Sequence, residues 1–245
     1  MSATESPLTD EMLDGMLAES FSDWPVYAEL LESHVDTPSL RSILDVGGGA
    51  GLISDHLIEL LPGAHVTIVD DSELVLARNK HHARKNLIHG SALDLTDAVA
   101  DQHFDLVIIN DLLHHLVAPT LRESRDNTVR CLRAARELLS EDGRILIYEI
   151  TMEGWWPGVD PGDLIYALTR TRVPPLTAIF RRLGANTAGV GVAFRSRSGW
   201  RKVFDDAGLE VEGEREGYVS QASLLRALAL GIRRIGAHVY LLRAR

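Results

Sequence analysis

Cysteine, positive charge and long apolar runs are all scarce in this sequence. Cys131 is the only cysteine among the 245 residues, so no disulfide can form within the chain, and its apolar helical context predicts a packing role. Aspartate and glutamate outnumber lysine and arginine by 35 to 25, and a formal net charge of −10 disfavours nucleic-acid binding, which needs a basic surface. The longest apolar runs, such as residues 106–109, have the length of a strand and not of a membrane span.

Two further absences narrow the class of protein. Residues 1–20 carry acids where a secretory signal would have a basic region followed by an apolar stretch, so we expect a cytoplasmic protein that does not act on membranes. The histidines, including the His81–His82 doublet on an expected charged helix, lack matching cysteine or acidic ligands at the spacing of a closed metal site. The sequence therefore predicts no metal centre and favours a small-molecule partner.

Short β-rich runs alternate with helical runs from Arg41 onward. In chain order they are RSILDV, GLISDHLIELL, HVTIVD, ELVLARNKHHARK, FDLVIIN and RILIYEI. Strands that are apolar throughout, with helices between them, predict an α/β fold with a doubly wound, mostly parallel sheet and helices on both faces. Ligands of such sheets bind at the carboxyl ends of the strands, so the search for a site begins there.

The flanking segments are expected to surround this sheet. Residues 1–40 should form a helical cover with helices at 12–17 and 25–35, and residues 41–245 should form one domain. A segment rich in glycine, proline and aromatic residues is expected to insert as a lid at 151–194. After the lid we expect a helix at 198–207, strands at 209–219 and 238–243, and an apolar helix between them at 224–235. The last strand is predicted to be antiparallel.

The strongest motif is an apolar strand that ends in Asp45 and a glycine-rich turn containing Gly47 and Gly49. Glycines at such a turn let a ligand approach the backbone closely. A dinucleotide fingerprint would have a third glycine at position 52, but Leu52 stands there, which disfavours a nicotinamide cofactor. The loop suits a zwitterionic amino-acid tail, because Asp45 can attract an ammonium group.

The next two strand ends carry polar residues of their own. The second strand ends at Asp70, whose carboxylate can accept both hydroxyls of a ribose, and Asp71 follows as a candidate cap of the next helix. Ser91 and Ala92 follow the expected third strand, where they would lie beside an adenine. These positions together predict an adenosine-containing ligand with an amino-acid tail.

These stretches resemble the class I S-adenosylmethionine-dependent methyltransferases, which have a Rossmann-like fold. The likeness spans roughly residues 41–209, and the DVGGGAG loop, the LHHL stretch and the Arg195 to Trp200 spacing resemble small-molecule O-methyltransferases of plants and actinomycetes. The resemblance implies that S-adenosylmethionine is the cofactor and that Gly47, Gly49, Asp70 and Asn110 contact it. Ser91 replaces the acidic residue usual in that family, so the resemblance does not extend to that residue's contact with the adenine amine. Ala92 would contribute only its backbone.

The resemblance also implies a pair of catalytic residues. It assigns the family's histidine base to His114 and the carboxylate that orients this base to Glu149; a histidine near its ordinary pKa can take the proton of a hydroxyl nucleophile. The chain departs from the family pattern because His115 and Leu116 replace an aspartate and a tryptophan. Packing or cofactor contact remains the alternative for His114, and a simple hydrogen bond at a strand end remains the alternative for Glu149.

The expected activity is methyl transfer from S-adenosylmethionine to a small organic molecule, with oxygen as the favoured acceptor atom. Residues 1–40 are too few for the large N-terminal dimerisation domain of the similar enzymes, so the sequence leaves monomer and homodimer open. Two alternatives belong to other classes of protein. One is a regulatory subunit that binds the cofactor without transferring a methyl group, and the other is a nicotinamide-dependent oxidoreductase.

Overall fold

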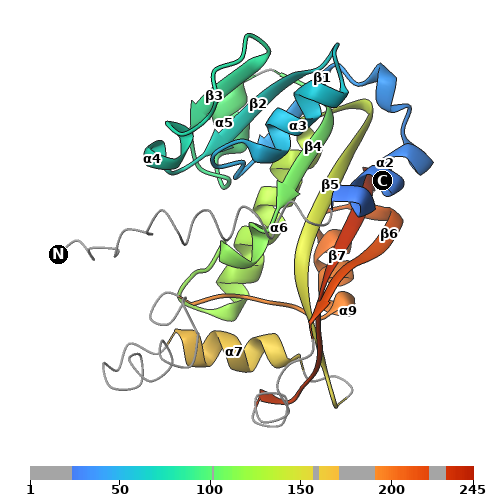
Figure 1. The fold of residues 1–245 in the computed structure, drawn as a ribbon. Coiled ribbons are helices and arrows are strands. Elements are labelled where there is room, and N and C mark those ends of the chain that lie inside the picture. The colour runs from blue at the N-terminus through green and yellow to red at the C-terminus, as the bar shows by residue number, and fades with distance from the viewer. Residues whose placement is uncertain (1–23, 101, 157–159, 171–190, 221–229) are drawn as a thin grey trace, which may run out of the picture.

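The computed structural model describes residues 24–100, 102–156, 160–170, 191–220 and 230–245. A single seven-stranded sheet forms the centre of the molecule (Figure 1). Its strands are β1 (Ser42–Val46), β2 (His65–Asp70), β3 (Lys85–His89), β4 (Phe104–Asn110), β5 (Leu139–Gly154), β6 (Leu209–Ser220) and β7 (Ile232–Ala244). The helices are α2 (Trp24–His34), α3 (Leu52–Leu60), α4 (Glu73–Leu76), α5 (Leu95–Val99), α6 (Leu121–Glu137), α7 (Pro161–Thr169) and α9 (Arg197–Asp206), with 3-10 helices η1 (Thr37–Ser39) and η2 (Leu113–His115).

The strand order is β3-β2-β1-β4-β5-β7-β6, and neighbouring strands from β3 to β5 are parallel. β7 is antiparallel to both of its neighbours, β5 and β6. The order reverses direction at β1 and β4, so the carboxyl ends of these two strands form the crevice where doubly wound sheets bind ligands. The structure confirms the predicted fold class, including the antiparallel strand near the end of the chain.

Successive strand residues point to opposite faces, and each face has its own apolar core. On one face, Val107 and Ile109 of β4 pack with Leu132 of α6 and with Trp200 and Phe204 of α9. On the other face the shared cluster contains buried residues of β1, β4, α2 and α3, among them Ile43, Ile108, Tyr27, Leu30 and Leu57. In Figure 1, α6 and α9 lie behind the sheet and α3 lies in front of it. Cys131 is fully buried in the α6 core, as the sequence predicted.

Side-chain caps fix where several helices begin. Thr120 and Glu123 form a capping box at the start of α6, in which each side chain binds the other residue's backbone N–H. Asp160 caps α7 through the Gly162 N–H, and its second carboxylate oxygen accepts hydrogen bonds from Ser196, the residue that caps α9. This shared aspartate ties the start of α7 to the start of α9.

The helix predicted at 73–85 is much shorter in the structure. Only α4 (Glu73–Leu76) is helical, His81 and His82 lie in the connection that follows, and Lys85 already begins β3. The Asn79 side chain explains the early end, because its amide donates to the carbonyls of Leu76 and Gly49. The apolar periodicity of this segment did not reveal that a polar side chain ends the helix and ties it to the glycine loop.

Two other predicted boundaries differ from the structure. Residues 151–154 continue β5 and do not belong to an insertion, because they pair with β7 as far as Gly154. Of the helix predicted at 224–235, residues 221–229 lie outside the described part, and residues 232–235 form the start of β7. The helix predicted at 12–17 also lies outside the described residues, whereas the one at 25–35 corresponds to α2. No helix in the described ranges is long and apolar enough to cross a membrane.

Candidate active site at the carboxyl edge of the sheet

The glycine loop joins β1 to α3 and has a backbone that side chains would strain. Gly47, Gly49 and Gly51 have φ values of +70°, +52° and +76°, a region that residues with a Cβ rarely adopt. A Cβ on Gly47 would lie 3.0 Å from the Leu112 side chain. The Gly47 N–H donates to the Val69 carbonyl at 2.7 Å, so the loop is held against β2. The loop therefore presents bare backbone at the end of β1.

Asp45 lies directly beneath this loop with a carboxylate that is only half satisfied. The side chain is 1 % exposed, and its Oδ2 accepts a 2.6 Å hydrogen bond from the Ser54 hydroxyl. Its buried Oδ1 has no hydrogen-bond partner among the described residues. Burial raises the pKa of Asp45 to about 6. A cationic group bound near the loop would favour the ionised carboxylate, so the orphaned oxygen fits the ammonium end of an amino acid.

Asp70 ends β2 and connects two pieces of backbone. Its Oδ2 accepts from the Gly49 N–H at 3.0 Å, and its Oδ1 accepts from the Ser72 N–H at 2.8 Å. An ionised carboxylate has about four lone-pair sites, so each oxygen can still accept one hydroxyl. Asp71 is exposed, and Ser72 caps α4 through its hydroxyl. The geometry thus fits Asp70 to the two hydroxyls of a ribose, and Asp71 is not the helix cap.

The residues predicted at the third and fourth strand ends have different surroundings. The Ser91 hydroxyl accepts from the Leu93 N–H at 3.1 Å, and Ala92 packs against the α6 core. No hydrogen bond joins either of them to another predicted site residue in the described part of the chain. Asn110, at the end of β4, accepts a hydrogen bond from the Tyr27 hydroxyl of α2. This contact fixes the amide so that its NH₂ group points away from Tyr27.

Tyr27 is a site residue that the sequence analysis missed. It is 1 % exposed and stacks on Tyr148 of β5 with ring centroids 5.5 Å apart. Its apolar periodicity in α2 predicts core packing, and nothing in the sequence indicates that its hydroxyl reaches a strand end 83 residues away. Asn79 was missed for a similar reason, since its amide donates to the Gly49 carbonyl at 2.6 Å from an irregular segment.

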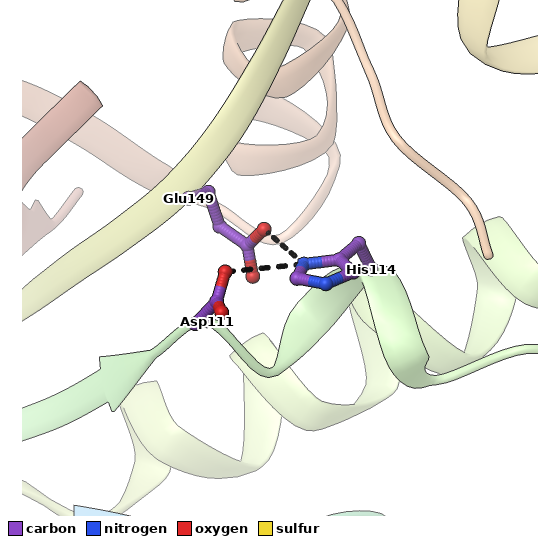
Figure 2. Close-up of side chains that lie close together, drawn as sticks. All are labelled: Asp111, His114 and Glu149. Carbon is purple, nitrogen blue, oxygen red and sulfur yellow. Dashed lines mark hydrogen bonds and ion pairs between the residues drawn. The ribbon is translucent and has the colours of Figure 1, made fainter. Parts of the chain in front are cut away.

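His114 and Glu149 are in direct contact, as Figure 2 shows. The His114 Nδ1 lies 2.8 Å from Glu149 Oε2, and the second carboxylate oxygen accepts from the Leu113 N–H at 2.6 Å. Both side chains are buried, with 2 % and 0 % exposure. The Phe194 ring stacks on the imidazole at 4.8 Å, and the Ala193 N–H donates to the His114 carbonyl. The contact between His114 and Glu149 was predicted only from the family resemblance, and the structure shows it.

Burial sets the protonation of this pair. It lowers the pKa of the His114 imidazole and raises the pKa of Glu149 to about 8, because an ion is costly away from water. His115, whose ring lies 4.1 Å from that of His114, has a pKa lowered to about 4 by the same cause. Both imidazoles are therefore neutral at neutral pH. A neutral His114 that donates from Nδ1 to Glu149 has Nε2 available to accept a proton.

Asp111 brings a third ligand-type side chain to this pair. One atom each of Asp111, His114 and Glu149 lies within 4.8 Å of the others, and the Asp111 carboxylate is 3.8 Å from His114 Nδ1. The imidazole and the Glu149 carboxylate already bind each other, and Leu113 binds the remaining Glu149 oxygen. His114 Nδ1 and both Glu149 oxygens are therefore already engaged in hydrogen bonds.

Comparison with known proteins agrees with this arrangement. Residues 44–145 match the family described as methyltransferase domain. A highly reducing polyketide synthase of Aspergillus nomiae is 28% identical over 65% of this chain and 7% of its own length. The ribosomal RNA large subunit methyltransferase G of Pseudoalteromonas atlantica is 27% identical over 51% of this chain and 36% of its own length. The chain thus spans well under half the length of these curated relatives.

Solved structures share the fold over nearly the whole chain. The mitomycin 7-O-methyltransferase MmcR superposes with a TM-score of 0.60 at 16% identity, covering 96% of this chain and 58% of its own. CalO1, a methyltransferase in calicheamicin biosynthesis solved in its S-adenosylhomocysteine-bound form, gives a TM-score of 0.53 at 17% identity and covers 99% and 65%. The match of residues 44–145 includes the glycine loop, Asp70 and the His114 segment. Residues 44–145 are therefore similar to a methyltransferase domain in sequence, and the chain as a whole shares its fold with these solved methyltransferases.

Proposed function

We propose that this protein transfers a methyl group from S-adenosylmethionine to an oxygen atom of a small organic molecule. The observation that carries the proposal is the buried His114–Glu149 contact of 2.8 Å, which lies one short turn beyond the end of β4. The glycine loop and Asp70 lie at the carboxyl ends of the neighbouring strands β1 and β2. A base and a set of cofactor-binding groups thus share one edge of the sheet.

The residues of the β1–β2 edge fit the cofactor. S-adenosylmethionine supplies a methyl group activated by a positively charged sulfur. Asp45 Oδ1 would accept from its ammonium group, the bare backbone at Gly47 and Gly49 would lie against its amino-acid tail, and Asp70 would accept from its ribose hydroxyls. Asn110 has an amide whose oxygen is already bound by Tyr27, so its NH₂ is the group available to the cofactor. Ser91 and Ala92 would border the adenine.

His114 would act as the base on the acceptor. When Glu149 is ionised, the His114 Nδ1–H would donate to it across their 2.8 Å contact, which would fix the tautomer and leave Nε2 as the proton acceptor. The acceptor hydroxyl would give its proton to Nε2 as its oxygen bonds to the methyl carbon and the carbon–sulfur bond breaks, so that S-adenosylhomocysteine leaves. The Glu149 carboxylate would stabilise the resulting imidazolium. Alignment of two reactants can supply about 7–11 kcal/mol of the barrier, and a positioned base adds about 10²- to 10⁴-fold.

The class of acceptor is part of the proposal. One relative acts, by its name, on ribosomal RNA, whereas MmcR is named for the 7-oxygen of mitomycin. A net charge of −10 disfavours RNA, since phosphates require a basic surface. The histidine base favours a hydroxyl acceptor, whose proton must leave for it to react well. Whether the chain acts as a monomer or a homodimer does not change the assignment of these residues.

A transfer assay tests the proposal. The purified protein is incubated with radiolabelled S-adenosylmethionine and separate panels of phenols, alcohols, carboxylic acids, amines and ribosomal RNA, and S-adenosylhomocysteine formation is measured. We expect turnover with hydroxyl compounds and little with RNA, and His114→Gln serves as the matched control. Cofactor binding without turnover on any panel would support a regulatory subunit. Protection from thermal unfolding by NADH but not by S-adenosylhomocysteine would support an oxidoreductase.

A further inference from the structure

Arg195 lies beside β5, close to the Glu149 that contacts His114. Its Cα pairs with Thr151 in an isolated parallel bridge, and its carbonyl accepts from the Met152 N–H at 3.0 Å. Residues in register on parallel strands point to the same face, and residues two apart on one strand also do. The Arg195 side chain therefore lies on the same face of the sheet as Thr151 and Glu149.

The guanidinium of Arg195 is buried and makes no direct ion pair with any of the described residues. The residue is 9 % exposed, and its Nε and Nη2 are buried with no hydrogen-bond partner among the described residues. It forms no ion pair within 4.0 Å in that part of the chain. Its Cζ lies 5.5 Å above the ring of Trp200, whose indole N–H donates to the carbonyl of Ile150, the residue after Glu149. A buried cation of this kind needs a negative charge nearby.

Glu149 has the opposite requirement. Its carboxylate is fully buried, and the groups that bind it directly are the Leu113 N–H and a neutral imidazole. Several other titratable groups surround the Glu149 carboxylate. They are Asp111 directly after β4, His114 and His115 of η2, Cys131 of α6, Tyr240 of β7, and Arg195. Arg195 is the one permanent cation in this set. Arg195 itself also faces Arg125 of α6 and the α7 carboxylates Asp160 and Asp163.

We propose that Arg195 is a positioning residue that favours the ionised form of Glu149, so that the His114–Glu149 pair can take a proton from the acceptor. This inference rests on the proposed function only for its purpose. The charge relation between Arg195 and the pair exists in the protein without cofactor or acceptor, where it can be measured separately.

The sign of the effect follows from the charge of the pair. The form able to accept a proton, neutral His114 with ionised Glu149, carries one more negative charge than the form with one added proton. A nearby cation stabilises the more negative form and lowers the pH at which the pair loses that proton. Removing the cation must therefore move this midpoint upward, regardless of which of the two residues holds the proton.

Nuclear magnetic resonance can measure this midpoint in the cofactor-free protein. The imidazole ¹⁵N signals of His114, identified by their loss in His114→Gln, are followed across pH in wild type, Arg195→Gln and Arg195→Lys. We expect Arg195→Gln to raise the midpoint by about one pH unit and Arg195→Lys to stay close to wild type, since lysine keeps the charge. Arg197→Gln is the matched control, because Arg197 is half exposed and ion-paired with Glu214.

A second variant leaves Arg195 in place and should act in the opposite direction. Asp163 is exposed and faces Arg195, so Asp163→Asn removes a charge that offsets the cation and should lower the midpoint slightly. This variant keeps the test valid if Arg195→Gln does not fold. An unchanged midpoint in folded Arg195→Gln, an equal rise in Arg197→Gln, or an upward shift in Asp163→Asn would overturn the inference. Absence of methyl transfer would instead contradict only the proposed function.

The same variants can be followed in turnover once an acceptor is known. Arg195→Gln should move the acidic limb of kcat/KM upward with the midpoint, and Arg195→Lys should restore it. A merely structural role would lower turnover equally at every pH. A raised acceptor KM with an unmoved limb would show that Arg195 binds the acceptor, which would contradict the role proposed here.

Discussion

The two halves of the candidate site are built in different ways. The β1–β2 half, with Asp45, the glycine loop and Asp70, uses backbone groups and side chains close together in sequence; Gly49 and Asp70 are 21 residues apart. The β4–β5 half depends on longer connections, such as the 35 residues between His114 and Glu149 and the return of the chain at Phe194 and Arg195. The first half is suited to binding the proposed cofactor through backbone and carboxylate groups. The second is suited to the proposed proton transfer, which depends on the burial of His114 and Glu149.

The largest effect should come from the glycine loop. Gly49→Val is expected to abolish detectable binding of S-adenosylhomocysteine by calorimetry, because a branched residue is strained at a φ of +52°. The fold should survive, since the added Cβ would make only an ordinary contact of 3.4 Å with Val75. Gly236→Ala in β7, where a Cβ also has ordinary contacts, is the control and should bind normally. Near-wild-type affinity in folded Gly49→Val would remove this half from the site.

The next largest effect should come from the β4–β5 half, which the following substitutions test by itself. His114→Gln should reduce turnover about 10²-fold or more with little change in cofactor affinity, because it removes a base and not a binding group. Glu149→Gln should cause a smaller fall, and the double variant should lose less than the sum of the two effects in free energy. Full additivity, or a lost cofactor affinity in His114→Gln, would show that the halves are not separate in function.

The pH profile sharpens this prediction. Glu149 must be ionised for His114 to work as proposed, and burial raises its pKa to about 8. Wild-type kcat/KM should therefore rise as the pH rises toward about 8, above the range of an ordinary histidine. His114→Gln should lack this rise. Residual activity in His114→Gln with the rise intact would exclude His114 as the base.

Substitutions at the adjacent residues Asp70 and Asp71 test which carboxylate would bind the ribose. Asp70→Ala should weaken S-adenosylhomocysteine binding by about 1.5–3 kcal/mol, the range for hydrogen bonds to a charged group. Asp71→Ala should have little effect, because Asp71 is exposed and Ser72 caps α4. The Asp70 carboxylate also binds Gly49 and Ser72, so circular dichroism must show an unchanged fold. A greater loss at Asp71 would mean that the ribose contact belongs to that residue.

The raised pKa of Asp45 should make the free energy of unfolding depend on pH. Its pKa is about 6 in the folded protein and 3.8 ordinarily, so the folded state binds the proton more tightly and stability from this group is lost as the pH rises from 3.8 to 6. Asp45→Asn cannot titrate. The free energy of unfolding of wild type relative to Asp45→Asn should therefore fall by about 2 kcal/mol between pH 4 and pH 7 in urea titrations. A constant difference across this range would contradict the raised pKa.

The smallest effect should come from Tyr27, which links α2 to the edge of the sheet. Tyr27→Phe removes the hydrogen bond to Asn110 and keeps the stack on Tyr148, so cofactor affinity should fall by about 1 kcal/mol. Tyr166→Phe is the matched control, because the Tyr166 hydroxyl donates to the Ala118 carbonyl of another loop. Equal losses in both variants would mean that Tyr27 acts through general stability.

The difference between the two halves of the candidate site also explains which features could be predicted from the sequence. Apolar strands separated by helices and a glycine turn after Asp45 are local patterns, and they were enough for the fold class and for placing the glycine loop and Asp70 at the ends of strands. Tyr27, Asn79 and the charge on Arg195 have no local signature, because each acts through a partner that only the tertiary structure brings near. The start of β7 was mistaken for helix because residues 232–235 are paired with β5, and the sequence does not show that pairing.

β7 has a consequence for the order of folding. It follows β6 in the chain but lies between β5 and β6 in the sheet, and it pairs Glu149 with His238. β1, β2 and β4 are synthesised before β6 and β7, and the loops that they close are shorter. They can therefore pair before β6 and β7 have left the ribosome. β5 gains its second neighbour only when β7 inserts. We therefore expect the glycine loop to be ordered early in folding and the His114–Glu149 contact to be among the last features to become buried.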